Sequence, residues 1–407
     1  MRIILVAYAL SPSQGSEPAT GWGWATELAQ VHTVTVISRE SNRTEVESFV
    51  RSHPECVLQF KWVPSRSRQG VLGQSRAYID WLQNVMDTCE VLMEKEQFDL
   101  IHLVSYGTIS APAPFWKLGL PFILGPIGGG QMVDVRFQEV LGMLPLDLRF
   151  RNARIRLLPY LPSIRNTIQR ASLVLATNRE TAELVKRCGG SPLLFNATGL
   201  RSEFIRNDAP IRIRSKGFKM LWTGRMLYRK ALPLAFYALK QTGRRDFTLD
   251  LVGDGPMAGA WQRLVKSLQI DNQVNFHGKV PFAEVFNFYD NADLFVFPSV
   301  SDAFGSQLLE AAARGLPILT LNHQGVDVLV PEGVAWKVPV DSIKNIIERM
   351  AEAMVLLADS PEQLSRMSEA AIRYAHSESW PRRVERMSSL YTQVVSDCSA
   401  VRRLSDD

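Results

Sequence analysis

Short apolar runs alternate with amphipathic stretches along most of the chain, and this alternation restricts the possible folds more than any other feature. The runs form two series of strand candidates: 3–6, 33–37, 100–103, 122–124 and 173–176, then 218–222, 249–252, 274–276, 294–297 and 318–321. Such alternation is typical of parallel sheets covered by helices. The polar, basic segment 201–217 separates the two series. The sequence therefore predicts two doubly wound α/β domains that meet near this segment.

Composition agrees with a globular enzyme-sized protein. The chain has 407 residues, of which 46% are hydrophobic and 21% charged, and no apolar run approaches the ~20 residues that span a bilayer. The opening MRIILVAYAL is interpreted as a buried strand and not as a secretory signal, because Arg2 is its only basic residue. Cysteines and histidines are dispersed, which predicts neither a disulfide framework nor a metal cluster. We expect a cytoplasmic protein.

Basic charge is concentrated in the segment 146–170, LDLRFRNARIRLLPYLPSIRNTIQR. It carries six arginines against the single acid Asp147, so its local charge equals the +5 of the whole chain. Apolar residues interleave with the arginines, a mixture that suits an anionic membrane surface or an acidic substrate. The alternative is a helix pair whose arginine stems lie over a core. Nucleic acid is not predicted as a partner, because the rest of the chain has no comparable stripe.

Two glycine-rich loops follow strands of the first series. GSEPATGWGW, 15–24, begins with Gly15 and leads into a predicted helix, and GPIGGGQ, 125–131, contains Gly128 and Gly129. Glycine lets backbone amides approach a ligand closely, and ligands of doubly wound folds bind at such loops. Both are candidate ligand-binding loops. A plain turn before a helix is the alternative for the first, whose spacing does not fit GxGxxG, and a flexible loop is the alternative for the second.

The segment TGRMLYRK, 223–230, places two cations after the first strand of the second series. Arg225 and Lys230 would clamp a phosphate, with the guanidinium offering a fork and the ammonium a point charge. Hydrogen bonds to charged groups contribute about 1.5–3 kcal/mol each, and contacts that strengthen as a phosphate leaves raise the rate. The alternative for either residue is a solvated surface charge.

The stretch FPSVSDAFGSQLLEAAARG, 297–315, carries two acids across the junction between a loop and a helix. The helix start offers backbone amides that can hold a diphosphate, those of Phe304, Gly305 and Ser306. Glu310 can then accept hydrogen bonds from a ribose diol, and Asp302 can reach the hydroxyls of a sugar. The alternatives are a helix-capping role for Asp302 and an i,i+4 pair between Glu310 and Arg314.

Together these stretches resemble glycosyltransferase family 4, whose members are retaining enzymes of the GT-B fold. Gly224, Arg225 and Lys230 resemble its G-R-x4-K clamp, and LVGDGP and HGKV resemble its G-x-G-P turn and its nucleobase-facing loop. The block ADLFVFPSVSDAFGSQLLEAAARGLPIL resembles its E-x7-E motif, the most specific signal of the set. ESWPRRVERMSSLYTQVV resembles its terminal helix, so the similarity extends over nearly the whole chain.

The resemblance implies two Rossmann-like domains that face each other across a cleft. Residues 1–202 with the C-terminal helix 380–400 would form the acceptor-side domain, and 203–379 the donor-binding domain. It also implies transfer of a sugar from a nucleoside diphospho-sugar with retained anomeric configuration and no required metal ion or other cofactor.

The resemblance also implies roles for the candidate residues. Arg225 and Lys230 would neutralise the leaving diphosphate, Asp302 would orient the donor sugar, and Glu310 would bind the ribose. The amides of the helix start would hold the sugar and phosphates, Gly15 would approach the phosphates, and Gly128 and Gly129 would lie against the donor. The nucleobase would contact the loop that contains Val280.

Three departures from the family pattern stand out. Asp302 replaces the first glutamate of E-x7-E and is shorter by one methylene. GPIGGG has no histidine, where many members carry one near the donor sugar. GSEPATGW differs from the commoner Gly-Gly loop. His102 resembles another histidine often seen in the family, for which we predict a structural role.

We therefore predict a retaining glycosyltransferase of the hexosyltransferase type, acting on a glycan or lipid-linked acceptor in surface polysaccharide or glycolipid synthesis. The basic, apolar segment 146–170 would bring it to the inner face of the membrane as a peripheral protein. A catalytically silent nucleotide-sugar-binding protein is one alternative. An epimerase or phosphorylase on the same fold is another.

Overall fold

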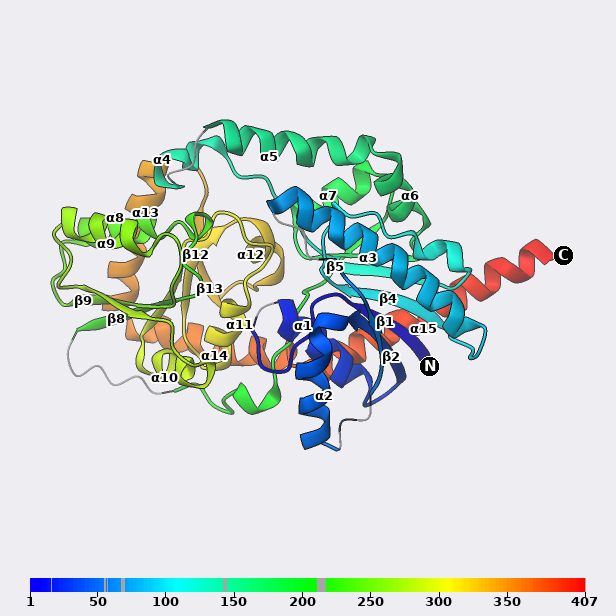
Figure 1. Cartoon of the computed structure of the whole chain (residues 1–407). Coiled ribbons are helices and arrows are strands. Elements are labelled where there is room, and N and C mark those ends of the chain that lie inside the picture. The colour runs from blue at the N-terminus through cyan, green and yellow to red at the C-terminus, as the bar shows by residue number, and fades with distance from the viewer. Residues whose placement is uncertain are drawn as a thin grey trace. The chain divides into compact units, whose positions relative to one another are not determined.

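The computed structural model describes residues 1–15, 17–54, 56, 58–66, 70–141, 145–210 and 217–406 (Figure 1). The chain divides into two compact units. The first comprises Met1–Gly130, Arg154–Gly199 and Trp380–Asp407, and the second comprises Gln131–Ala153 and Leu200–Ser379.

The first unit is built on a seven-stranded parallel sheet in the order β3-β2-β1-β4-β5-β6-β7. Its strands are β1 (Arg2–Ala7), β2 (Thr33–Arg39), β3 (Gln59–Val63), β4 (Leu100–Ser105), β5 (Phe122–Ile127), β6 (Leu173–Ala176) and β7 (Pro192–Leu194). Its longer helices are α1 (Glu17–Leu28), α2 (Arg43–Ser52), α3 (Gly70–Met93), α6 (Pro162–Arg170), α7 (Arg179–Arg187) and α15 (Trp380–Asp406).

Both faces of the first sheet are buried. In β1, Ile3 and Leu5 join a core cluster with Trp24 of α1, whereas Ile4 and Val6 join a second cluster with Trp81 of α3. Successive side chains of a strand point to opposite faces, so a strand buried on both sides is a continuous apolar run. This explains why the central strands were readable from the sequence.

The second unit contains a six-stranded parallel sheet in the order β10-β9-β8-β11-β12-β13. Its strands are β8 (Phe218–Thr223), β9 (Phe247–Val252), β10 (Val274–Gly278), β11 (Leu294–Phe297), β12 (Ile318–Asn322) and β13 (Ala335–Pro339). Its longer helices are α8 (Leu232–Thr242), α9 (Ala258–Ser267), α10 (Phe282–Asn291), α11 (Ser306–Ala313), α13 (Ile343–Asp359) and α14 (Pro361–Ser377), and the short α12 is Gln324–Leu329.

The prediction of two doubly wound parallel-sheet units is confirmed, and every predicted strand lies within an observed one. The strands that the sequence did not reveal are β3, β7 and β13, which lie at sheet edges. β3 alternates between exposed and partly buried residues, and β7 has three residues, two of them exposed. Edge strands have one open side, so their apolar signal is weaker.

Residues 131–153 belong to the second unit, whereas the sequence placed them in the first. Three of them carry buried apolar side chains in the second unit's core, namely Val133, Phe137 and Leu141. Phe137 ends a short 3-10 helix, and Leu141 ends α4 (Gln138–Leu141), which packs against α8 (Figure 1). The apolar contacts of these side chains are therefore the reason for the difference.

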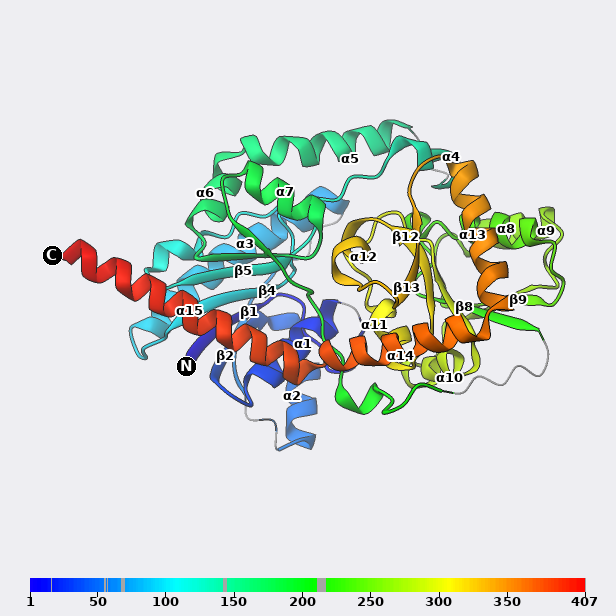
Figure 2. The same cartoon turned by 180° about the vertical axis from the view of Figure 1, so that it is seen from behind.

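Helix α15 returns to the first unit and packs along it (Figure 2). The Trp380 ring lies so close to Gly23 of α1 that a β-carbon at position 23 would clash with it.

Further along α15, the Tyr391 hydroxyl lies 2.6 Å from His102 Nδ1, while His102 Nε2 donates to the Gly125 carbonyl at 2.7 Å. His102 is fully buried, and burial lowers its pKa to about 4, so the ring is neutral. As predicted, His102 has a structural role.

In the described part of the chain, no helix combines the length and apolarity that crossing a bilayer requires.

Candidate active site

The candidate site of the second unit lies where its strand order changes direction. β8 pairs with β9 on one side and with β11 on the other. After β8 the chain continues to β9, and after β11 it continues to β12, on the opposite side of the sheet. The two connections therefore start at neighbouring carboxyl ends and run in opposite directions. Ligands of doubly wound sheets bind at this switch point. The predicted residues Arg225 and Lys230 follow β8, and Asp302 follows β11.

The loop after β8 holds its two predicted cations in different environments. Arg225 is exposed, whereas Lys230 is 4% exposed and ends the 3-10 turn Tyr228–Lys230. The next residue, Ala231, has a φ of 47° and caps α8. This left-handed residue separates the 3-10 turn from the helix, and the Lys230 side chain reaches Asp302.

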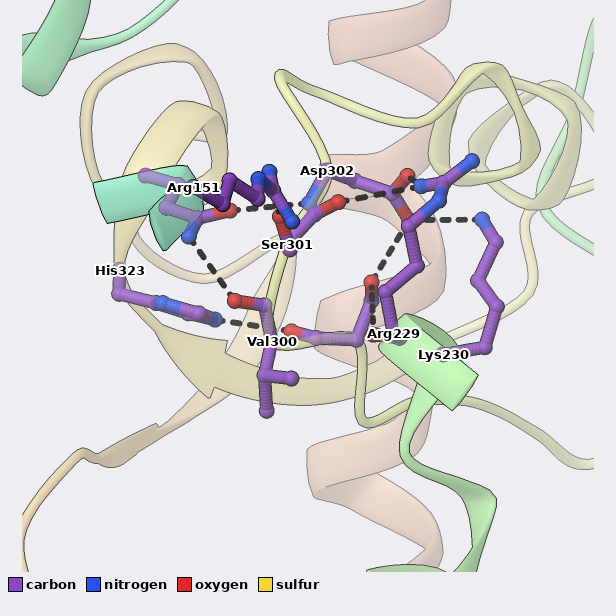
Figure 3. Close-up of polar contacts among 9 residues, drawn as sticks. Arg151, Arg229, Lys230, Val300, Ser301, Asp302 and His323 are labelled. Atoms are coloured by element: carbon purple, nitrogen blue, oxygen red, sulfur yellow. Dashed lines mark hydrogen bonds and ion pairs between the residues drawn. The ribbon is translucent and has the colours of Figure 1, made fainter. Parts of the chain in front are cut away.

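Asp302 joins the loop after β11 to the basic loop (Figure 3). Its Oδ2 lies 2.6 Å from Lys230 Nζ and accepts from the Ser299 hydroxyl at 2.7 Å, and its Oδ1 forms an ion pair with Arg229. The Asp302 side chain is 11% exposed. The helix-capping alternative for Asp302 is wrong, because Gly305 occupies the N-cap position of α11.

Side chains that the sequence analysis missed hold the loop 299–302 in place. His323 Nε2 donates to the Ser299 carbonyl at 2.8 Å, and Gln324 bonds both the Val300 carbonyl, at 3.0 Å, and the Asp302 amide, at 2.9 Å. Arg151 donates to the Ser301 hydroxyl at 2.9 Å (Figure 3). His323 and Gln324 follow β12, which lies next to β11 in the sheet, so the order of the strands brings them to this loop and no local sequence signal marks them.

The electrostatics of the site favour an anionic ligand. Burial and, after it, the nearby Arg229 guanidinium lower the pKa of Lys230 to about 7, and the Glu310 carboxylate opposes them by favouring the ammonium. Two cations share one carboxylate here. Burial lowers the pKa of Arg229, and the nearby Arg151 and the exposed Arg225 lower it further. The cluster thus has an excess of positive charge that a diphosphate can neutralise.

The start of α11 supplies backbone donors beside this cluster. Gly305 has a φ of 104°, and a β-carbon there would press into the Phe297 ring, so glycine is required at this turn. The Phe304 side chain is buried in the core. Within the described chain, the amides of Phe304, Gly305 and Ser306 have no hydrogen-bond partner. They are therefore available to an anion.

Glu310 is partly buried midway along α11. Its Oε2 accepts from the Tyr289 hydroxyl at 2.9 Å, and the Ser306 hydroxyl one turn earlier also donates to its carboxylate. Burial raises the pKa of Glu310. Arg314, its proposed i,i+4 partner, donates from Nε to Asp290 Oδ1 at 2.8 Å and also pairs with Oδ2. Glu310 is therefore not a solvated surface acid.

The remaining predicted residue of this unit, Val280, lies just after β10. It is partly buried and packs against the core cluster that contains Phe286 and Tyr289.

The predicted glycines of the first unit have different surroundings. Gly15 is exposed two residues before α1, and a β-carbon there would meet no atom within 4 Å. The Gly128 amide donates to the Gly107 carbonyl at 2.9 Å, so it is already occupied. Gly129 has a φ of 96°. Gly130 packs against the Thr181 backbone at the start of α7, which explains part of this glycine run without a ligand.

Parts of the chain are similar to known glycosyltransferases. Residues 203–374 match the family model of glycosyl transferases group 1. The putative colanic acid biosynthesis glycosyltransferase WcaL of Salmonella typhimurium is 25% identical over 203 residues, which are 47% of this chain and 50% of WcaL. The D-inositol 3-phosphate glycosyltransferase of Streptomyces griseus is 32% identical over 136 residues, covering 33% of this chain and 28% of that protein. The chain thus spans at most about half of the length of these relatives.

Solved structures match the whole architecture. HepE of Anabaena, crystallised with UDP, superposes with a TM-score of 0.67 at 16% identity, covering 97% of this chain and 100% of HepE. Sucrose-phosphate synthase of Thermosynechococcus elongatus gives a TM-score of 0.72 at 17% identity, with coverage of 97% and 99%. The chain therefore has the fold of the GT-B glycosyltransferases, and separately its segment 203–374 matches the family model of glycosyl transferases group 1.

Proposed function

We propose that the protein is a glycosyltransferase that moves a sugar from a nucleoside diphospho-sugar to a glycan or lipid-linked acceptor. One observation carries this proposal. The basic loop after β8 and the unpartnered amides at the start of α11 meet at the switch point of one sheet. Cations beside free amides are suited to hold a diphosphate.

In this proposal the diphosphate takes the place of Asp302 as the partner of Lys230. Lys230 and Arg225 neutralise the charge that develops on the leaving diphosphate, and contacts of this kind lower the barrier when they strengthen in the transition state. Asp302, released from Lys230, accepts hydrogen bonds from hydroxyls of the donor sugar. Glu310, oriented by Tyr289, binds the ribose. Transfer proceeds with retention and without a metal ion.

The names of similar proteins support the substrate classes. HepE has been crystallised with UDP and with UDP-glucose, so a uridine diphospho-sugar is the first donor to test. WcaL is named for colanic acid biosynthesis, which supports a polysaccharide acceptor. The hexosyltransferase type is part of the same proposal.

We also propose that the protein is peripheral on an anionic membrane surface. Helix α5 (Pro145–Leu157) exposes Leu146, Phe150 and Leu157, whose helical spacing puts them on one side. Ile155, on the opposite side, is buried, so among the described side chains of α5 this is the face that packs against the protein. The exposed side chains of Arg149 and Arg156 flank the apolar stripe. This is the pattern of a helix that lies in a membrane interface.

Calorimetry of the full chain with UDP, GDP and ADP tests the donor site. We expect binding of at least one of them, and we expect Lys230→Ala to weaken it about tenfold or more, because a charge-assisted hydrogen bond is lost. Lys240→Ala, which removes an exposed lysine from α8, is the matched control. Equal affinity in wild type and Lys230→Ala would refute the assignment.

Transfer itself requires a second measurement, because a silent binding protein would pass the first. Slow hydrolysis of a radiolabelled uridine diphospho-sugar, or its transfer to lipid-linked glycans, should depend on Asp302 and Lys230. Donor binding combined with background hydrolysis and transfer would favour the silent binder.

A further inference from the structure

A pocket of the first unit lies at the switch point of its own sheet. β1 pairs with β2 on one side and β4 on the other, and the pocket opens beside the residues that follow β1 and β4. Its volume is about 550 Å³, within the usual range for small-molecule sites. Its walls include Tyr8, Glu17, Arg39, Arg66, Tyr78 and Tyr106.

Three tyrosines form an aromatic wall in this pocket. The Tyr8 ring centroid lies 4.8 Å from that of Tyr78 and 5.6 Å from that of Tyr106, and the Tyr78 and Tyr106 centroids are 5.1 Å apart. Tyr78 is buried, whereas Tyr106 is 43% exposed. Rings that combine an apolar face with a hydroxyl suit a ligand that has both C–H faces and polar groups, such as a sugar ring.

Two charged groups of the pocket are held in fixed positions. Arg39 Nε donates to the Tyr8 carbonyl at 2.8 Å, and its guanidinium carbon lies 4.1 Å from the Tyr8 ring centroid. A Glu17 carboxylate oxygen accepts from the Gly107 amide at 2.9 Å. In the described part of the chain neither Arg39 nor Glu17 forms an ion pair, so both groups are available to a ligand, and burial raises the pKa of the Glu17 carboxyl. Such preorganisation reduces the entropy lost on binding.

A second cavity of about 320 Å³ shares Glu17, Tyr78 and Tyr106 with the first. It adds the hydroxyls of Thr108 and Ser110 and a further cation, Arg154. The two cavities together have three arginines, Arg39, Arg66 and Arg154, against the single carboxylate of Glu17. Their combined lining is therefore net positive.

We propose that this pocket binds a saccharide residue that carries a negatively charged substituent. The tyrosines face the sugar ring, Glu17 accepts hydrogen bonds from its hydroxyls, and Arg39 with Arg66 binds its carboxylate or phosphate. This inference rests on the proposed function in one respect, since it makes the acceptor of the transfer reaction an acidic glycan. A neutral sugar would leave the excess of positive charge in the lining unpaired.

Calorimetry of the full chain with three monosaccharides tests this assignment. Methyl glucuronide carries a carboxylate, glucose 6-phosphate carries a phosphate, and methyl glucoside is neutral. At least one acidic sugar should bind about tenfold or more tightly than the neutral one, because charged hydrogen bonds are added. The acid that binds tighter identifies the substituent. Equal affinity for all three, or no binding, would overturn the proposal.

Variants locate the effect in the pocket. Arg39→Gln should remove about tenfold of the affinity for the acidic sugar and leave the neutral one unchanged. Arg66→Gln should have the same effect on affinity. Because Arg66 is exposed, this variant tests the pocket even if Arg39→Gln does not fold. Arg51→Gln, an exposed change on α2, is the matched control. If both pocket variants bind like wild type, the assignment is wrong.

UDP binding by the same preparations separates the two proposals. If UDP binds but acidic sugars bind no more tightly than the neutral one, only the pocket assignment is rejected. Selectivity for acidic sugars without nucleotide binding rejects the donor site and leaves the pocket as a saccharide site of another function.

Discussion

At the residue scale, Asp302 combines a contact that the structure shows with a role that we propose. A buried ammonium such as that of Lys230 is costly unless a counter-charge lies close, and Asp302 supplies this charge at 2.6 Å. The same carboxylate is the candidate for the donor sugar. Asp302 is one methylene shorter than the glutamate of the family motif. In this chain its carboxylate contacts Lys230 and Arg229, and Ser299 and Gln324 hold its loop.

Asp302→Asn should lower the free energy of unfolding by about 3 kcal/mol, because it removes the buried carboxylate that Lys230, Arg229 and Ser299 share. The matched control is Asp246→Asn, which removes one partner of the exposed pair with Arg244 and should cost less than about 1 kcal/mol. Urea unfolding followed by circular dichroism measures both. Similar small losses in the two variants would show that Asp302 does not stabilise Lys230.

At the element scale, the connections after the strands decide which side chains meet. The sequence predicted all of the strands except β3, β7 and β13, and also the start of α11, because buried parallel strands and helix starts have local patterns. It could not predict that Asp302 binds Lys230, nor that His323 and Gln324 hold the loop 299–302. Those contacts join residues far apart in the sequence and depend on the order of the strands.

The same limit applies to Glu310 and to Gly130. Helical periodicity placed Glu310 on a polar face, but Tyr289 of the adjacent α10 covers that face and accounts for its burial. Glycine repetition suggested a ligand at 125–131, whereas Gly130 makes room for the start of α7. Local pattern shows which residues are polar or small, and only packing shows what they contact.

The contact between β4 and α15 predicts a pH dependence of stability. The native pKa of His102 is about 4, and that of an unfolded histidine is about 6.5, so the unfolded state binds more protons between these values and stability falls with decreasing pH. His102 alone should reduce the free energy of unfolding by about 2 kcal/mol between roughly pH 7 and pH 5. Chemical unfolding at both pH values, in wild type and His102→Gln, measures this contribution. An identical loss in the variant would assign it to other groups.

At the scale of the whole molecule, the positive charge and the exposed apolar residues are concentrated in the same segment. The net charge of the chain is +5, and the segment 146–170 carries an equal excess of arginine. Leu146 and Phe150 are 75% and 70% exposed, which is high for large apolar side chains. Because arginines flank this stripe, we propose an anionic lipid surface as its partner, and charge and apolar insertion should both contribute.

Sedimentation with vesicles tests this proposal. We expect binding to vesicles that contain phosphatidylserine and little binding to pure phosphatidylcholine, because each arginine near an anionic surface contributes about 1 kcal/mol. Phe150→Ser combined with Leu157→Ser should weaken binding about tenfold or more, since two apolar side chains can no longer insert. Val91→Ser, which changes an exposed apolar residue of α3, is the control and should bind like wild type. Equal binding to both kinds of vesicle, or unchanged binding of the double variant, would exclude α5 as the membrane-contacting element.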